Sequence, residues 1–171
     1  LDLLRDIPGL HLDVAGKGEE MDICKTLAEE LSVRHLVTFH GQISRQEVDR
    51  LYANADVFCF PSFREPSGSV VFEALSFGLP VVVADCGGPG HVVDDTCGFK
   101  VAVVEPVQFS QQIAAAVRTL AGMPELRKRL SAGAIKKMTE IGLWPAKIER
   151  LLAIYDEIKQ PSLELQEISS C

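Results

Sequence analysis

Short apolar runs alternate with stretches of helical periodicity along most of the chain. The runs are rich in Val, Leu and Phe, have the length of single strands, and occupy residues 10–16, 36–41, 56–61, 80–85 and 99–104. The run at 80–85, PVVVAD, is β-branched throughout its centre, which is typical of a strand buried on both faces. The pattern therefore predicts five strands separated by other elements.

Between these runs, apolar residues recur at intervals of three and four, which predicts amphipathic helices. Ile23, Leu27 and Leu31 share one face of the first helix. Ser44 and Glu47 form an S-x-x-E capping box that opens the second. The helices are expected near 20–31, from 44 through 52, at 68–78, from 106 to 120, and near 124–140 and 145–159.

Strands that alternate with helices of this length imply parallel β-α-β units. We therefore expect an α/β fold, a doubly wound open parallel sheet with helices on both faces. The domain should span 1–160, followed by a loose tail at 161–171. Ligands of such sheets bind beyond the carboxyl ends of the strands, which directs attention to the loops after residues 15, 41, 61 and 85.

Composition narrows the possible functions. The 171 residues include 17 Lys and Arg against 24 Asp and Glu, a net charge of −7, which argues against a partner of duplex nucleic acid. No apolar stretch approaches the roughly 20 residues that span a bilayer. The 5 cysteines share no C-x-x-C spacing. Their spacing favours reduced thiols and therefore a cytoplasmic protein. Contact of the protein with the inner surface of the membrane is a less favoured interpretation.

One helix start carries an unusual set of polar residues. Glu73 is the one charge within VVFEALSF, and it shares a narrow polar stripe with Ser69 and Ser76. A carboxylate in such a place is either solvated or faces a cleft, where it needs hydrogen-bond donors. A vicinal diol, such as the two hydroxyls of a ribose, offers two donors.

Glu65 lies eight residues before Glu73, in a loop shaped by Pro66 and Gly68. The free amides at the start of the following helix, together with the helix dipole, are able to hold a diphosphate without a metal. The spacing thus predicts a single binding site in which Glu65, the helix-start amides and Glu73 bind sugar hydroxyls, phosphate and ribose, respectively. The alternative is a solvated helix with an acidic cap at Glu65, and spacing alone leaves it open.

The stretch REPSGSVVFEALSFGLPVVVADCGGP resembles the E-x7-E region of retaining glycosyltransferases of the GT-B fold, family four, group 1 type. The segments AGKGEE, VTFHGQIS, RLYANADVFCFPS and GFKV extend the likeness, as does the final helix that begins at Trp144. The resemblance covers residues 1–160, which correspond to most of the carboxy-terminal, donor-binding domain.

The resemblance implies roles for particular residues. Glu65, the catalytic residue of the pair, would lie by the hydroxyls of the transferred sugar, and Glu73 would bind the ribose. The other substrate-binding residues implied are Pro66, Ser67, Gly68, Ser69 and Val70 around the sugar and diphosphate, Gln42 and Ile43 near the base, and Gly16 in the turn that lines the cleft.

The same resemblance implies a retaining transfer from a nucleoside diphosphate sugar to an acceptor glycan, lipid or small molecule, with no metal and no further cofactor. Members of the family also hold the diphosphate with an Arg/Lys pair after the first strand of this domain. That strand and an amino-terminal acceptor domain would precede Leu1. We therefore expect the chain to be a piece of a longer protein, and the isolated piece to be inactive.

Two other functions are considered beside transfer. The chain could bind a nucleotide sugar without turning it over, or belong to a nucleotide-sugar epimerase of the same fold. A dinucleotide-binding loop at Gly16–Gly18 is disfavoured, because Met21 stands where the third glycine of G-x-G-x-x-G belongs.

Overall fold

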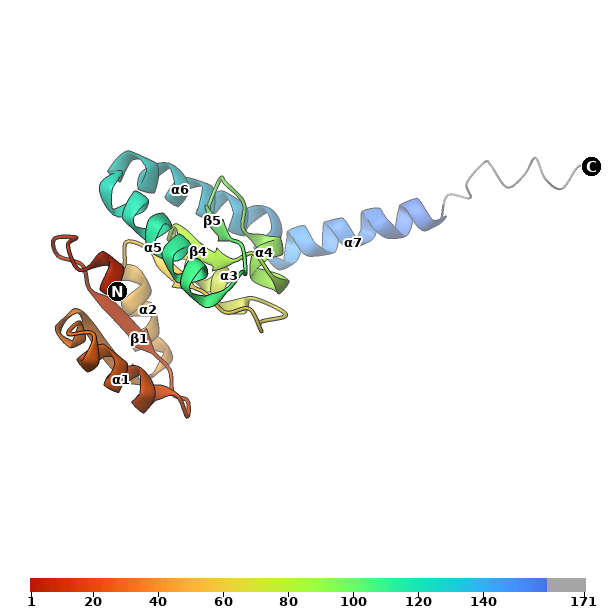
Figure 1. The fold of residues 1–171 in the computed structure, drawn as a ribbon. Helices are drawn as coiled ribbons and strands as arrows, with labels where there is room; N and C mark the ends of the chain where they lie inside the picture. Colours follow the sequence, from red (N-terminus) through yellow and green to blue (C-terminus); the bar gives the residue numbers. More distant parts are fainter. Residues whose placement is uncertain (160–171) are drawn as a thin grey trace, which may run out of the picture.

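Parallel strands form the framework of the structure, a computed structural model that describes residues 1–159 (Figure 1). The strands are β1 (Leu12–Ala15), β2 (Val37–Gly41), β3 (Phe58–Phe60), β4 (Val81–Ala84) and β5 (Gly98–Val101). The first four lie inside the predicted runs. The fifth starts one residue before its run and ends at Val101, so that Val103 and Val104 are exposed. The predicted tail at 161–171 lies outside the described residues.

The strands are divided between two sheets. β1 pairs with β2, with Leu12 opposite Val37, whereas β4 lies between β3 and β5, with Val82 opposite both Cys59 and Phe99. Every pairing is parallel, as the alternation of strands and helices predicts. Within residues 1–159, β1, β2, β3 and β5 each have one edge to which no strand is paired.

Helices follow the strands in the predicted order. They are α1 (Met21–Glu30), α2 (Arg45–Asn54), α3 (Ser69–Ser76), α4 (Gly87–Val92), α5 (Pro106–Gly122), α6 (Pro124–Lys137) and α7 (Trp144–Lys159). Two 3₁₀ turns, η1 (Asp2–Leu4) and η2 (Arg34–Leu36), precede β1 and β2, and a π-helical turn, η3 (Met138–Gly142), joins α6 to α7. The helix predicted at 124–140 is therefore interrupted after Lys137.

The three-stranded sheet is covered on both faces, because alternate residues of β4 point to opposite sides. Val81 and Val83 pack into a cluster with Leu75 of α3, while Val82 packs into another with Leu120 of α5. All five side chains are almost completely buried. Burying each of them contributes about 1.5–3 kcal/mol, so this double layer supplies much of the stability that holds the start of α3 in place.

Two predicted apolar faces are not covered. Ile23, Leu27 and Leu31 of the α1 segment remain 61%, 49% and 38% exposed, because α1 contacts the two-stranded sheet chiefly through Ala28. Helix α7 extends away from the body of the molecule (Figure 1) and also exposes its apolar residues. None of the helices among residues 1–159 combines the length and the apolar character needed to cross a membrane.

Candidate functional site

The start of α3 presents backbone amides that the helix itself cannot use. The preceding residue, Gly68, has a φ of 69°, in the left-handed region that glycine adopts without strain. The amide of Val71 donates to the Gly68 carbonyl oxygen at 2.9 Å. The amides of Ser69 and Val70 have no acceptor within residues 1–159, as expected for the first residues of a helix. This end of α3 can therefore donate two hydrogen bonds to an anion.

Glu65 holds the loop before α3 in shape. Its Oε1 accepts hydrogen bonds from the Ser67 hydroxyl at 2.7 Å and from the amides of Ser67 and Gly68, each at 3.0 Å. The Ser67 hydroxyl, with these two amides, lowers the pKa of the Glu65 carboxyl below its ordinary value. Glu65 is thus an anion at neutral pH, and all three of these bonds end on Oε1.

Glu73 lies one turn further along α3 and faces α2. The Arg45 guanidinium forms an ion pair with it, with Nη1 at 2.8 Å from Oε1, and the Tyr52 hydroxyl donates a long hydrogen bond of 3.5 Å to Oε2. The Glu73 side chain is 31% exposed, which leaves it accessible to a ligand. The spacing of polar residues in α3 predicted its exposure to a polar partner but not that α2 supplies one.

Tyr52 is a fixed support for this carboxylate. Its ring lies 5.6 Å from that of Phe58 and 5.4 Å from that of Phe77, and the residue is 8% exposed. Burial, and next the charge of Glu73, raise the pKa of the Tyr52 hydroxyl to about 12. The hydroxyl therefore stays protonated and remains a donor to Glu73.

The end of β2, which leads into α2, is hydrogen-bonded to the turn after β1. The Gly16 amide donates to the Gly41 carbonyl oxygen at 2.8 Å, and both glycines have positive φ. Gln42 is exposed and Ile43 is half-buried between Gly41 and the capping box that starts α2. Gly16 therefore lies beside the segment that leads to Arg45, whose side chain reaches Glu73. Within the described residues, no hydrogen bond or ion pair joins Gln42 or Ile43 to either acid.

The glycine-rich segment after β4, where a loop was expected, is helical: it forms α4 (Gly87–Val92). The first turn of α4 lies against the loop that holds Glu65. A Cβ atom on Gly87 would lie 2.5 Å from the Glu65 carbonyl oxygen, and one on Gly88 would lie 2.6 Å from the Pro66 carbonyl oxygen. These glycines therefore permit the loop to approach α4 closely, in addition to the positive φ of Gly87.

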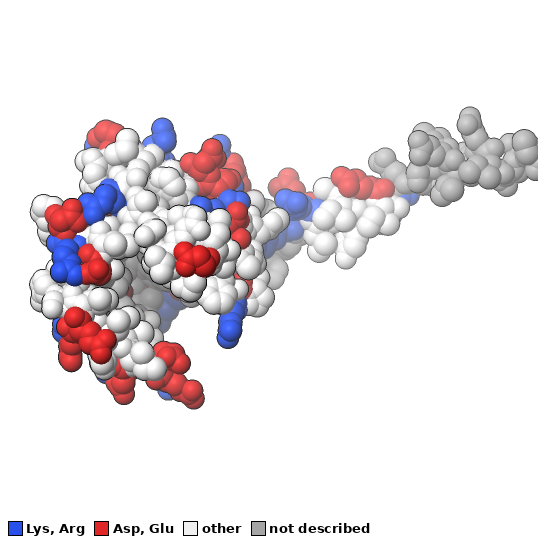
Figure 2. All heavy atoms as spheres, viewed as in Figure 1, with Lys and Arg blue, Asp and Glu red and all other residues white. Residues whose placement is uncertain are grey.

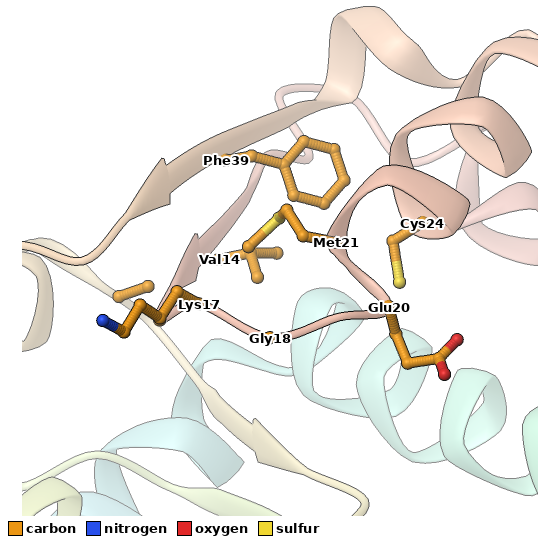
Figure 3. Close-up of a pocket in the computed structure, with 9 residues that line it drawn as sticks. Val14, Lys17, Gly18, Glu20, Met21, Cys24 and Phe39 are labelled. Carbon is orange, nitrogen blue, oxygen red and sulfur yellow. The ribbon is translucent and has the colours of Figure 1, made fainter.

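A separate hollow of about 260 Å³ lies at the end of β1, and Gly16 is the one predicted site residue that lines it. Figure 3 shows the side chains of Val14, Met21 and Phe39 gathered at its base, with Lys17 and Glu20 towards opposite ends. Glu65 and Glu73 are not part of its lining. Met21 contributes an apolar side chain to its lining, which does not suit a dinucleotide diphosphate.

Two electrostatic features complete the picture of the surface. Within residues 1–159, no three His, Cys, Asp or Glu side chains are grouped closely enough to hold a metal ion. Acidic and basic side chains are interspersed over the face drawn in Figure 2.

Comparison with known proteins identifies the family. Residues 1–137 match the family described as glycosyl transferases group 1. The chain belongs to this family. The matched region contains both acids, the α4 segment and all five strands of the described structure.

Two curated relatives show how much of a group 1 glycosyltransferase the chain represents. It is 34% identical over 134 residues to a D-inositol 3-phosphate glycosyltransferase of Thermomonospora curvata, covering 78% of this chain and 30% of the relative. It is 29% identical over 172 residues to a glycogen synthase of Mycobacterium tuberculosis, covering 96% of this chain and 41% of the relative. The chain thus spans less than half the length of either relative.

Solved structures agree on the fold. The C-terminal domain of a glycosyl transferase group 1 family protein, LpcC, from Francisella tularensis has a TM-score of 0.71 at 23% identity, covering 83% of this chain and 74% of that one. A pneumococcal O-GlcNAc transferase, GtfA, in complex with UDP and GlcNAc has a TM-score of 0.75 at 19% identity, covering 92% of this chain and 31% of that one. The fold is that of the C-terminal half of GT-B glycosyltransferases, as the resemblance implied.

Proposed function

We propose that the chain is the donor-binding domain of a glycosyltransferase that moves a sugar from a nucleoside diphosphate sugar to an acceptor hydroxyl, with retention and without a metal. The observation that carries the proposal is the start of α3, where the unused amides of Ser69 and Val70 lie in the sequence between two carboxylates, Glu65 and Glu73. Membership of a glycosyltransferase family supports this use of the two acids.

In this proposal the donor is held along the start of α3. The ribose diol donates to Glu73, and the amides of Ser69 and Val70 bind the diphosphate. The segment Pro66–Gly68 lies beside the sugar and the diphosphate, with its two amides donating to Glu65. The second oxygen of Glu65 receives hydroxyls of the transferred sugar. Catalysis then rests on positioning the donor and on stabilising the departing diphosphate by fixed dipoles.

The loops before α2 complete the proposed donor site. Gln42 and Ile43 flank the base, and Gly16 keeps the neighbouring turn tight through its hydrogen bond to Gly41. The pneumococcal transferase of similar fold was solved with UDP, which supports a nucleoside diphosphate as the class of ligand.

The proposal also includes segments of a longer protein that lie outside the 171 residues. The chain covers 30% and 41% of the two relatives described above, and both sheets have edges with no paired strand among residues 1–159, at β1, β2, β3 and β5. We assign residues 1–160 to the donor-binding domain and place a preceding strand, a basic pair and an acceptor domain in a longer cytoplasmic protein. The names of the relatives include a polysaccharide and a small phosphorylated polyol, so a glycan, a lipid or a small molecule is the acceptor class.

Calorimetric titration with UDP, GDP and ADP tests the donor site. Glu73→Ala removes two charge-assisted hydrogen bonds to the diol, so we expect at least a tenfold loss of affinity for the nucleotide that binds. Glu125→Ala, which removes an exposed acid of α6, is the control and should bind as the wild type does. Equal affinity of the Glu73→Ala variant and the wild type would remove the ribose assignment.

A binding module without turnover is the second candidate function, and the small share of its relatives that the chain covers favours it. Incubation of the 171-residue chain with donors and acceptors separates the two functions. We expect nucleotide binding but no transfer by the chain alone. Measurable transfer would show that the chain contains a complete catalytic site.

A further inference from the structure

Arg45 joins α2 to the carboxylate proposed to bind ribose. It is the first residue of α2, and its guanidinium lies between two acids, with Nη1 at 2.8 Å from Glu73 Oε1 and Nε at 2.9 Å from Asp49 Oδ1. With Tyr52 near Oε2, both oxygens of Glu73 have a neighbour from the same helix. We infer that Arg45 is a positioning residue, which holds Glu73 in the orientation that a ribose diol requires.

The geometry permits Arg45 to stay in place when a ligand binds. A carboxylate oxygen has two lone pairs, so each oxygen of Glu73 keeps acceptor capacity beside Arg45 and Tyr52. The Arg45 side chain is 59% exposed and is itself tied to Asp49, one helical turn away. A carboxylate oriented before binding loses less rotational freedom when the diol arrives, which favours affinity.

Charge gives Arg45 a second effect on the same site. A nucleoside diphosphate brings several negative charges close to Glu73, and an uncompensated carboxylate would repel them. The Arg45 guanidinium offsets the charge of Glu73 without removing its acceptor oxygens. Loss of Arg45 should therefore weaken binding of a ligand that contacts Glu73.

The ion pair could also serve only to fasten α2 to α3. Ion pairs between exposed side chains contribute little to folding, typically below about 1 kcal/mol, so stability alone is a poor measure of its role. A fastening role, like the charge effect, would act on every nucleoside diphosphate alike, whereas positioning of Glu73 adds an effect only for ligands that carry the diol. The two roles are separated by the choice of ligand.

The inference rests on the proposed donor site. Its test compares two ligands: the nucleoside diphosphate that binds best among UDP, GDP and ADP, and the 2′,3′-dideoxy analogue of that nucleotide. Arg45→Met keeps the length of the side chain and removes its charge. We expect roughly a fivefold loss of affinity for the ribonucleotide and less than a twofold change for the dideoxy analogue. Arg45→Lys, which retains the charge but not the planar fork, should recover part of the loss.

Arg50→Met is the control, because Arg50 is an exposed residue of the same helix, and it should bind both ligands as the wild type does. The effect of Arg45→Met should also disappear in a Glu73→Gln background. Equal weakening of both ligands, or ribonucleotide binding that is unchanged or tighter in Arg45→Met, would overturn the positioning role alone. Wild-type chain that binds no nucleotide, or binding that is indifferent to Glu73, would overturn the proposed donor site as well.

Discussion

The backbone amide of Gly88 donates a hydrogen bond of 3.3 Å to the carbonyl oxygen of Glu65. This bond joins the first turn of α4 to the loop that precedes α3, although the two segments are more than twenty residues apart in the chain. The side chain of Glu65 meanwhile binds the amides of Ser67 and Gly68. The loop is therefore held from both sides, by its own acid and by a neighbouring helix.

Gly88→Ala should disturb this loop. The added Cβ atom would lie 2.6 Å from the Pro66 carbonyl oxygen and from the Ser67 carbonyl group, and a backbone cannot yield as a flexible side chain does. We expect a loss of about 1–3 kcal/mol in the free energy of unfolding, measured with denaturant, and a parallel loss of nucleotide affinity. Gly122→Ala is the control, since nothing lies within 4 Å of its added Cβ. Wild-type stability in Gly88→Ala would contradict the close packing of α4 on the loop.

The pKa of Glu65 provides a direct measure of the loop. It should lie below the ordinary 4.5, because the Ser67 hydroxyl and the two amides favour the charged form. Titration of the carboxyl carbon by NMR measures the pKa. Ser67→Ala removes the largest cause, so the pKa should rise towards 4.5, whereas Ser110→Ala, on α5, should leave it unchanged.

This pKa shift also has a consequence for stability. A carboxyl whose pKa is lower in the folded state stabilises that state above its unfolded pKa, here 4.5, and loses this contribution as pH falls through the folded value. The stability difference between the wild type and Glu65→Gln should therefore be constant above about pH 5 and shrink below it. A difference that does not depend on pH would contradict the hydrogen bonds of Glu65.

Much of the fold could be predicted because its strongest local signals agree with its packing. The β-branched run at Val81–Val83 is buried on both faces as expected, and Ser44 and Glu47 form both bonds of the capping box. In these places the residues that favour an element locally are also the ones that its tertiary contacts use.

The features that could not be predicted depend on contacts between segments that are distant in the sequence. The helix at α4 contains three glycines and a proline, whose low helix propensity favoured a loop, but packing against Glu65–Gly68 stabilises the helix. The partner of Glu73 could not be found either, because Arg45 is 28 positions away and has no distinguishing local pattern. The one feature of the sequence that could have pointed to Arg45 is its position directly after the capping Ser44, at the start of the helix that follows a strand.

Tyr52 should ionise well above the ordinary pH for a tyrosine. Burial and the charge of Glu73 raise the pKa of the Tyr52 hydroxyl to about 12 from 10.0, and the chain contains 2 tyrosines. Ultraviolet titration should thus show one tyrosine ionising only at the higher pH, and Tyr52→Phe should abolish that step. The folded state retains the proton longer than the unfolded state does, so the stability due to this group should fall as pH rises from 10 towards 12. A wild-type titration that loses no step near pH 12 when Tyr52 is replaced by Phe would contradict the burial of Tyr52.

Removal of divalent metal should leave nucleotide binding intact. In the proposed site the diphosphate is bound by the amides of Ser69 and Val70 at the start of α3, whose dipoles require no metal to be oriented. We expect the dissociation constant of the bound nucleoside diphosphate, measured by calorimetry, to change by less than about twofold between excess EDTA and Mg²⁺ at matched ionic strength. Sodium chloride added to the same ionic strength is the control, because it screens the charges without coordinating the phosphates. A tenfold loss of affinity in EDTA would mean that the amides alone do not hold the diphosphate, since the metal would then supply the missing charge.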